Sequence, residues 1–258
     1  MSSYNQDFSR YTVIDSQEVS GAGSVAKQFM ANVFVWMFVA LGISALMALA
    51  FAFVPSFSSI MYADIVTQSG GVAKTLTGVG MVASFLPLIF VFTMSLAFNR
   101  LSAPALTLFF IAYAAAMGMS LSVLLLVYTS GSVIGCFGGA SAMFGVMAVL
   151  GYTTKQDLTS FGRILFMGLI GIVIASLINM FLGSPGLNYL ISIIGVAVFT
   201  GLTAYDVQKL KNIGAGLEFE GTSVNDTKKL AIMGALSLYL DFINLFIMLM
   251  RLFGSRRN

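Results

Sequence analysis

Histidine is absent from the 258 residues of this chain, and cysteine, tryptophan and charged side chains are scarce. Without histidine there is no Ser-His-Asp or Cys-His catalytic group, and the usual nitrogen ligands of zinc and haem are missing. The single cysteine, Cys136, excludes a disulfide within the chain and is best interpreted as a small packing residue. The sequence therefore predicts no resident cofactor.

Charged residues make up only 9% of the chain, whereas hydrophobic residues make up 58% and the mean hydropathy is +0.94. An ordinary soluble domain carries about 25% charged residues. Uncharged tracts run from Lys27 to Asp64, from Lys74 to Arg100, from Arg100 to Lys155 and from Arg163 to Asp206. These tracts are typical of a polytopic membrane protein.

A spanning helix needs about 20 apolar residues, so the first two tracts hold one span each and the longer two hold two each. The predicted breaks within the longer tracts lie near Thr129-Ser-Gly131 and Gly183-Ser-Pro-Gly186. The apolar tracts do not alternate in polarity with a period of two, as the strands of a β-barrel would. We therefore predict an all-α fold. Its seven transmembrane helices are expected at residues 30–54, 79–99, 104–128, 131–152, 164–182, 188–210 and 230–253.

The predicted domain organisation is a polar N-terminal tail, residues 1–29, followed by one seven-helix transmembrane domain, residues 30–258. The tail has no apolar core followed by a small-residue cleavage site, so we predict no cleavable signal peptide. Basic residues concentrate on one side of the predicted membrane, which favours a cytoplasmic amino terminus. The inner set is Arg10, Lys27, Arg100, Lys155, Arg163, Lys209, Lys211, Lys228 and Lys229. The isoelectric point near 9.0 then describes topology and implies no nucleic-acid partner.

Small residues predict where helices approach one another closely, because apolar burial gains little in lipid. In the fourth predicted span, Gly131, Gly135 and Gly139 recur at every fourth position. We expect this helix to lie against neighbours over most of its length. The third span carries Ala114-Ala-Ala116 and Gly118, which predicts the same kind of contact.

Two acids, Asp206 and Asp241, lie inside the last two predicted spans. A carboxylate at mid-bilayer depth costs roughly 2.5–3.5 kcal/mol on insertion scales, so an acid there is a candidate functional residue. Ser237, Asp241 and Asn244 share one face of the last helix, and Thr203 shares a face with Asp206. On adjacent antiparallel helices the two acids could share a proton and sense pH, or share a hard cation such as calcium.

Arg100 ends the second predicted span on the same inner side as Asp206. An ion pair between Arg100 and Asp206 could latch the inner mouth, and protonation of the acid would release it. Alternatively, Arg100 simply marks the membrane edge. The residues by themselves leave both interpretations open.

The segments that contain the acids resemble the signature segments of the Bax inhibitor-1 family, also called the transmembrane Bax inhibitor motif proteins. The first is Gly201…Tyr205-Asp206-Val-Gln208, and the second is Ala235-Leu-Ser-Leu-Tyr-Leu-Asp-Phe-Ile-Asn-Leu-Phe246 followed by Arg251-Leu-Phe-Gly254. The resemblance implies a bundle whose last helix is central, with the other six helices around it as two groups of three. The compact loops of the chain favour a bacterial inner-membrane protein.

The resemblance further implies a proton-sensitive calcium leak, with Asp206 and Asp241 as the paired acids and Arg100 as the latch. The alternative function is a membrane interaction protein that modulates a membrane protease or a cell-death effector. An intramembrane aspartyl protease is disfavoured because neither acid has a Gly-x-Gly-Asp context, and we predict no enzymatic activity. A proton-coupled transporter is also disfavoured, because no inverted repeat with matching broken helices is evident in the sequence.

Overall fold

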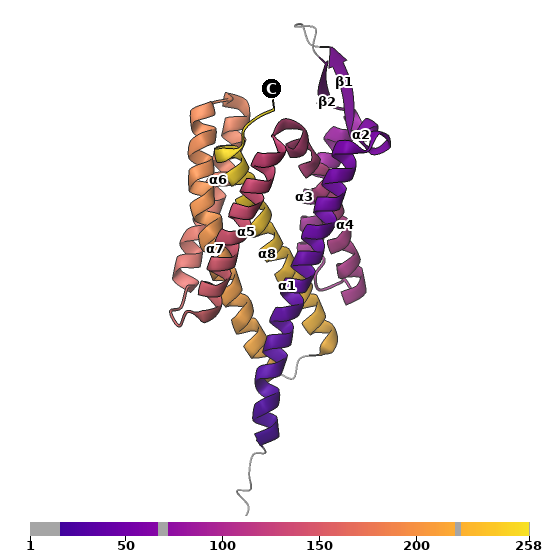
Figure 1. The fold of residues 1–258 in the computed structure, drawn as a ribbon. Helices are drawn as coiled ribbons and strands as arrows, with labels where there is room; N and C mark the ends of the chain where they lie inside the picture. The colour runs from indigo at the N-terminus through magenta and orange to yellow at the C-terminus, as the bar shows by residue number, and fades with distance from the viewer. Residues whose placement is uncertain (1–15, 67–71, 220–222, 258) are drawn as a thin grey trace, which may run out of the picture.

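The computed structural model describes residues 16–66, 72–219 and 223–257, except for the side chains of 16–24, 66, 72–73 and 218–219. Within these residues seven helices are long and apolar enough to span a membrane, as predicted. They are α1 (Ser16–Phe53), α3 (Gly78–Leu96), α4 (Ala103–Val127), α5 (Ser130–Thr153), α6 (Thr159–Leu182), α7 (Pro185–Phe219) and α8 (Val224–Phe253). The predicted all-α class is confirmed, and Figure 1 shows the helices as one bundle.

Helix α1 begins within the segment predicted as a polar tail. It is helical from Ser16 onward, and Phe29 is buried in the core. Residues 1–15 of the predicted tail lie outside the described residues.

The two predicted breaks are turns with recognisable caps. Between α4 and α5, the Thr129 hydroxyl accepts a hydrogen bond from the Ser132 backbone N–H, which is the usual way a helix begins. Between α6 and α7, Gly183 adopts a left-handed conformation with φ of 61°, which glycine reaches at little cost, and Pro185 follows at the start of α7. Local sequence therefore decides where these hairpins turn.

The polar stretch between α1 and α3 forms more structure than an outer loop. A short helix, α2 (Pro55–Met61), leads into an antiparallel hairpin of β1 (Tyr62–Val66) and β2 (Val72–Leu76), in which Tyr62 pairs with Leu76. The Tyr62 and Ser122 hydroxyls lie 2.7 Å apart, so the hairpin is anchored to α4. The hairpin projects from the end of the bundle that carries the carboxyl terminus (Figure 1).

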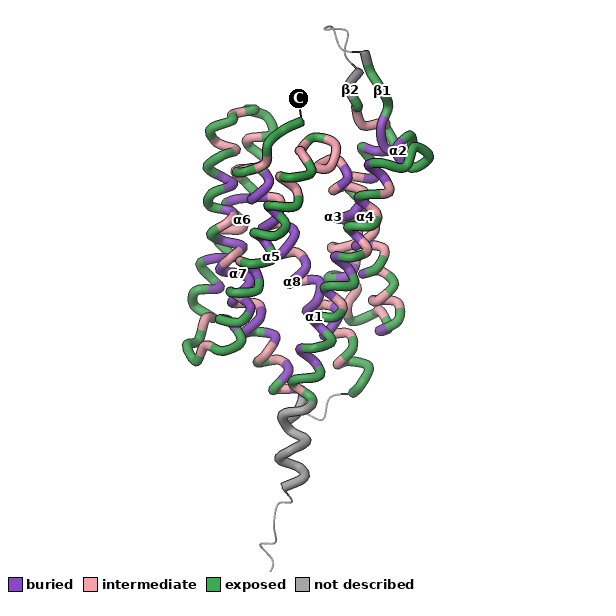
Figure 2. The backbone as a smooth tube through the Cα atoms, in the orientation of Figure 1, coloured by how far each residue is buried: buried purple, intermediate pink, exposed green. Residues whose placement is uncertain are grey.

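Helix α8 lies at the centre of the bundle, as the resemblance implies. It contacts α1 and α4 on one side and α5 and α7 on the other, while α3 packs on α4 and α6 packs on α7. The six other helices therefore form two groups of three, one on each side of α8 (Figure 1). Figure 2 shows buried residues along α8 and on the sides of its neighbours that face it.

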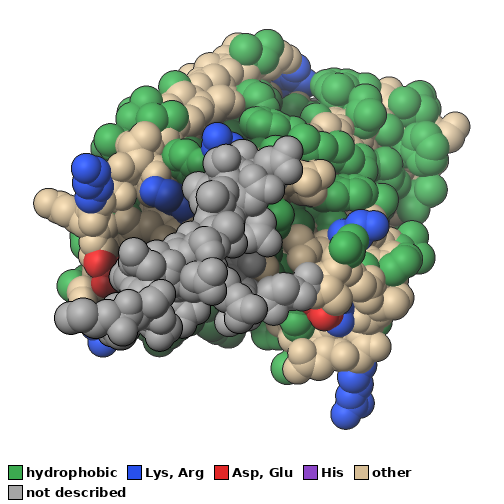
Figure 3. Space-filling view, turned by 90° about the horizontal axis from the view of Figure 1, so that it is seen from below, with side chains coloured by type: hydrophobic (Ala, Val, Ile, Leu, Met, Phe, Trp, Pro, Cys, Tyr) green, Lys and Arg blue, Asp and Glu red, His purple; other side chains and the backbone are tan. Residues whose placement is uncertain are grey.

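The predicted inner basic residues that the structure describes lie at one end of the bundle. The helices alternate in direction, so the turns that carry Arg100, Lys155 and Arg163 lie at the end where α1 begins. Figure 3 shows several Lys and Arg side chains around that end. The arrangement agrees with the charge rule from which a cytoplasmic amino terminus is predicted.

Close helix contacts occur where small residues meet a neighbouring backbone, but not along the predicted stripe of α5. Gly118 of α4 lies against the Ser44 carbonyl of α1, and Gly151 of α5 lies against the Ala204 carbonyl of α7. By contrast, a Cβ added at Gly131 or Gly135 would meet nothing within 4 Å. Helix α5 does lie against α7 and α8, as predicted, but the glycine stripe is not its contact face, because the buried residues are Cys136, Ala140, Phe144, Ala148 and Gly151.

We expect the substitution Gly118→Ala to lower the free energy of unfolding by about 1–3 kcal/mol, because the new methyl group has no room beside the α1 backbone. Denaturant-induced unfolding of the purified protein in detergent measures the change. The matched control is Gly135→Ala, also a helical glycine, where open space leaves only the higher helix propensity of alanine, so the free energy of unfolding should stay equal or rise by up to about 1 kcal/mol. Equal effects of the two substitutions would contradict the contact.

Candidate functional site

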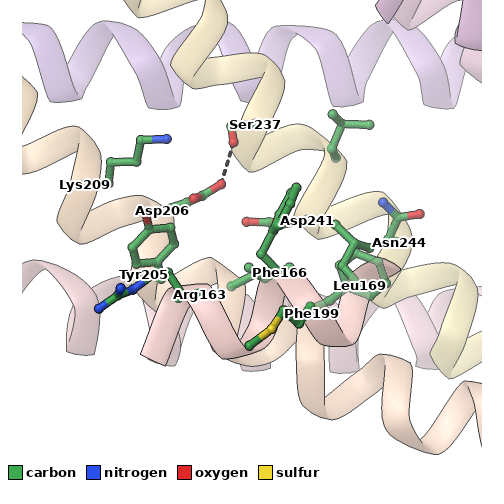
Figure 4. A pocket seen from close by; sticks show the side chains of 14 residues that line it. Arg163, Phe166, Leu169, Phe199, Tyr205, Asp206, Lys209, Ser237, Asp241 and Asn244 are labelled. Atoms are coloured by element: carbon green, nitrogen blue, oxygen red, sulfur yellow. Dashed lines mark hydrogen bonds between the residues drawn. The ribbon is translucent and has the colours of Figure 1, made fainter. Parts of the chain in front are cut away.

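A cavity of about 660 Å³ lies between α6, α7 and α8 and contains both acids (Figure 4). Much of its wall is apolar and comes from all three helices, including Phe166 and Leu169 of α6, Phe199 and Leu202 of α7, and Leu240 of α8. Its polar lining consists of Arg163, Tyr205, Asp206, Lys209, Ser237, Asp241 and Asn244. Volume and lining are those of a small-molecule or ion site rather than of a packing defect.

Asp206 projects from α7 toward α8 and is partly buried. The Ser237 hydroxyl of α8 donates a hydrogen bond of 2.5 Å to Asp206 Oδ2. This contact joins α7 and α8, and the sequence did not predict it. One oxygen of Asp206 is therefore held in place while the side chain still lines the cavity.

Asp241 is more deeply buried, with 5% of its surface exposed. Its Oδ2 atom is fully enclosed and accepts no hydrogen bond from a donor group of the described residues, while the carboxyl group as a whole lies within hydrogen-bond reach of the Asp206 carboxyl group. An unpaired polar atom of this kind costs about 1–3 kcal/mol, and more when it is charged. The structure therefore leaves one carboxylate oxygen available to a proton or to a cation.

A hydrogen-bond network on the opposite side of α8 fixes how this helix is rotated. The Ser44 hydroxyl of α1 donates to the Ala114 carbonyl of α4, so the Tyr239 hydroxyl must donate to Ser44, at 2.7 Å. Two residues along a helix correspond to a rotation of about 200°. With Tyr239 held against α1 and α4, Asp241 has to face the cavity.

The predicted polar stripe of α8 lines the cavity as expected, since Ser237, Asp241 and Asn244 all contribute to its wall. Thr203 does not reach it. Thr203 is completely buried, and its hydroxyl donates to the Phe199 carbonyl one turn earlier on α7, at 2.8 Å. A threonine that satisfies its own helix backbone in this way has no donor left for Asp206.

Arg100 is not brought to Asp206. It is exposed in the turn that follows α3, and no ion pair joins it to Asp206 in the described part of the chain. The reason is the grouping of the helices, because α3 packs on α4 and Asp206 belongs to α7 of the other group. The Arg100–Asp206 latch is thus not present in this conformation.

The basic residues that do line the cavity, Arg163 and Lys209, were not selected from the sequence as site residues. Lys209 lies three residues after Asp206 on α7, and Arg163 lies in the second turn of α6. The spacing of Lys209 from Asp206 could have indicated that Lys209 lies near this acid. Nothing in the sequence indicated Arg163, because only the packing of α6 on α7 brings it near.

Gln208 holds the beginning of α6 in place and was also missed. Its side chain is buried, accepts a hydrogen bond from the Leu158 backbone N–H at 2.8 Å, and donates to the Gln156 carbonyl at 2.7 Å. In the same turn, hydrogen bonds from the Thr159 hydroxyl and backbone N–H lower the pKa of Asp157. Both contacts order the turn that positions Arg163.

The arrangement is suited to holding a cation without a dedicated cage of protein ligands. Calcium takes six to eight oxygen ligands, which include carboxylates, amide carbonyls and water. Asp206, Asp241, Ser237 and Asn244 offer oxygens around one cavity. In the described part of the chain no cluster combines three or more His, Cys, Asp or Glu residues, so water would have to complete any such shell.

Comparison with known proteins identifies a family and several bacterial relatives. Residues 26–258 match the protein family described as Inhibitor of apoptosis-promoting Bax1. The chain is 43% identical over 229 residues to the inner membrane protein YbhL of Escherichia coli, covering 89% of this chain and 92% of YbhL. It is also 41% identical over 234 residues to an uncharacterized protein of Borreliella burgdorferi, covering 91% and 94% of the two chains. An uncharacterized protein of Caulobacter vibrioides is 35% identical over the full length of both chains.

We expect Asp241→Leu to raise the free energy of unfolding by about 1–3 kcal/mol, because it removes a buried oxygen that has no donor, keeps the branched shape of the side chain, and has the adjacent cavity to take the larger methyl groups. Denaturant titration in detergent measures the change. Asp206→Asn is the matched control: the Ser237 hydroxyl can still donate to the amide oxygen, so the change should stay within about 1 kcal/mol. A loss of stability in Asp241→Leu would show that the carboxylate is already partnered.

Proposed function

The chain belongs to the Bax inhibitor-1 family of membrane proteins, and from this premise we propose that it forms a pH-modulated leak pathway for calcium in the bacterial inner membrane. The acids Asp206 and Asp241 are the proposed pH sensor and the ion-binding groups. Ser237 and Asn244 complete the polar wall of the pathway. No covalent chemistry is proposed.

The observation that carries this proposal is the buried Oδ2 atom of Asp241, which accepts no hydrogen bond from a donor group of the described residues. A polar atom at this depth is expensive in a protein surrounded by lipid, and such groups are kept where they serve an ion or proton path. Its position beside Asp206, in one cavity on neighbouring helices, supplies two carboxylates to the same ion. Protons and calcium compete for these oxygens, which is why flux should depend on pH.

The outer half of the bundle supports a gated pathway rather than a permanently open one. In this part α7 and α8 approach so closely that a Cβ at Gly195 would lie 2.8 Å from Cγ and Sδ of Met248. Neither residue lines the cavity, which is bounded by residues nearer the inner end. We infer that conduction requires α7 and α8 to separate around Gly195 and Met248.

We expect calcium flux into proteoliposomes to fall about tenfold or more in the double variant Asp206→Asn, Asp241→Asn, because both anionic ligands are removed. The remaining flux should no longer change with pH. A fluorescent calcium indicator inside the vesicles measures both quantities. Asp64→Asn is the control, since this exposed acid belongs to the hairpin and not to the cavity, and its flux should equal that of the wild type. Equal flux from the double variant and the wild type would reject the proposal.

A second candidate function is a membrane interaction protein that modulates a membrane protease or a cell-death effector. One observation favours it: the glycines of α5 that face outward. A Cβ added at Gly131, Gly135, Gly138 or Gly145 would meet nothing within 4 Å, and all four glycines are exposed. Small residues on a lipid-facing helix allow a partner helix to approach closely.

For this second function we expect a photocrosslinking residue at Gly138 to capture a protein partner in native membranes. The same residue at Ile174, an exposed position at similar depth on α6, should capture only lipid. Mass spectrometry of the crosslinked products identifies what each position contacts. Capture of lipid alone from both positions would contradict an interaction surface on α5.

A further inference from the structure

Charges of both signs line the cavity between α6, α7 and α8. Arg163 and Lys209 contribute two cations, and Asp206 and Asp241 contribute two acids. No ion pair joins these four residues within the described structure, so each sign remains available to a bound molecule. A simple cation would use the acids alone and would meet the two basic side chains as a barrier.

The order of the charges along the cavity is defined. In Figure 4, Lys209 and Arg163 lie on one side of Asp206, and Asp241 and Asn244 lie on the other. Asp206 and Lys209 are separated by three residues on α7, which places their Cβ atoms roughly 5–6 Å apart. The cavity is therefore complementary to a molecule that carries an anionic group and an ammonium group a few bonds apart.

The basic and acidic ends of the cavity lie at the depths expected for the phosphate and the ammonium of a lipid headgroup. Arg163 is in the second turn of α6, near the inner end of the span, where phosphates of the inner leaflet lie. The acids are deeper: both line the cavity, and Asp241 is almost fully buried. Basic pockets between transmembrane helices on the cytoplasmic side are known to bind lipid headgroups.

The cavity also borders on the bilayer. Phe166 and Met167 of α6 line it and are 58% and 62% exposed on a lipid-facing helix. Helix α6 packs on α7 and not closely on α8, so the wall between α6 and α8 is formed by side chains rather than by a helix contact. Acyl chains attached to a headgroup in the cavity could leave on this side.

From these observations we propose that the cavity binds the headgroup of an aminophospholipid. The phosphate pairs with Arg163 and Lys209, and the primary ammonium donates to the carboxyl groups of Asp206 and Asp241. The acyl chains lie along Phe166 and Met167. A primary ammonium has three N–H donors, whereas a trimethylated one has none, so the site discriminates phosphatidylethanolamine from phosphatidylcholine. This inference concerns a lipid ligand and goes beyond the calcium pathway.

Native mass spectrometry of the purified full-length protein tests the site, after exchange into calcium-free detergent with equal amounts of phosphatidylethanolamine, phosphatidylcholine and phosphatidylglycerol of identical chains. We expect the wild type to retain phosphatidylethanolamine about tenfold more than the other two lipids, the effect of roughly one net hydrogen bond from its ammonium. The double variant Asp206→Asn, Asp241→Asn should lose this preference. The double variant Arg163→Gln, Lys209→Gln should retain less of every phospholipid.

Lys155→Gln is the matched control, because this exposed basic residue lies at the same end of the bundle and outside the cavity. Lys155→Gln should retain the wild-type preference for phosphatidylethanolamine. Asp206→Glu keeps a carboxylate at this position, so it should keep part of the preference that the double Asp variant loses. Equal retention of phosphatidylethanolamine and phosphatidylcholine by the wild type would overturn the proposal. If soluble phosphoethanolamine displaced the lipid at equal concentration, the natural ligand would be the free headgroup and not a lipid, and the proposal of a lipid ligand would be overturned. Unchanged calcium flux in the double variant Asp206→Asn, Asp241→Asn, together with loss of its lipid preference, would overturn the calcium pathway and leave this inference standing.

Discussion

The cost of an unpaired carboxylate among lipid-embedded helices is the constraint on which this structure depends. Asp241 is 5% exposed, and its Oδ2 atom accepts no hydrogen bond from a donor group of the described residues. A side chain of this kind is tolerated only inside a bundle, where other helices shield it from hydrocarbon. The central position of α8 follows from this requirement. The Tyr239–Ser44–Ala114 hydrogen bonds then fix its rotation so that the acid meets a cavity and not a packed wall.

Close backbone contacts elsewhere in the bundle offset the destabilising effect of the buried acids. Gly118 and Gly151 bring backbones of α4 and α5 into direct contact with α1 and α7, and such contacts replace the hydrophobic driving force that lipid removes. The two three-helix groups meet mainly through α8 and through the contact of α1 with α7. A bundle divided in this way has a natural plane along which its halves can shift. The cavity lies within one half and against α8, so such a shift would change its shape.

The two ligands inferred for the cavity use overlapping groups. Calcium would take the carboxylate oxygens of Asp206 and Asp241, and a lipid ammonium would donate to the same atoms. Arg163 and Lys209 favour the lipid, because they attract phosphate and repel a metal ion. Occupation by a lipid would thus exclude calcium, and the composition of the membrane would become a regulator of the pathway. The exposed glycines of α5 lie on another helix face and are independent of this competition.

The sequence by itself determined the seven spans, the turns at Thr129 and Gly183, and the shared face of Ser237, Asp241 and Asn244, because hydrophobic length, capping residues and helical spacing are local properties. It also indicated that Asp206 and Asp241 matter, since an acid in an apolar tract is expensive in any bundle. Only the tertiary structure decided which surfaces meet. It turned most glycines of α5 outward, separated Arg100 from Asp206, enclosed Thr203, and brought Arg163 and Lys209 to the acids. Contacts between helices depend on the packing of side chains far apart in the chain, and no pattern within one helix specifies its neighbour.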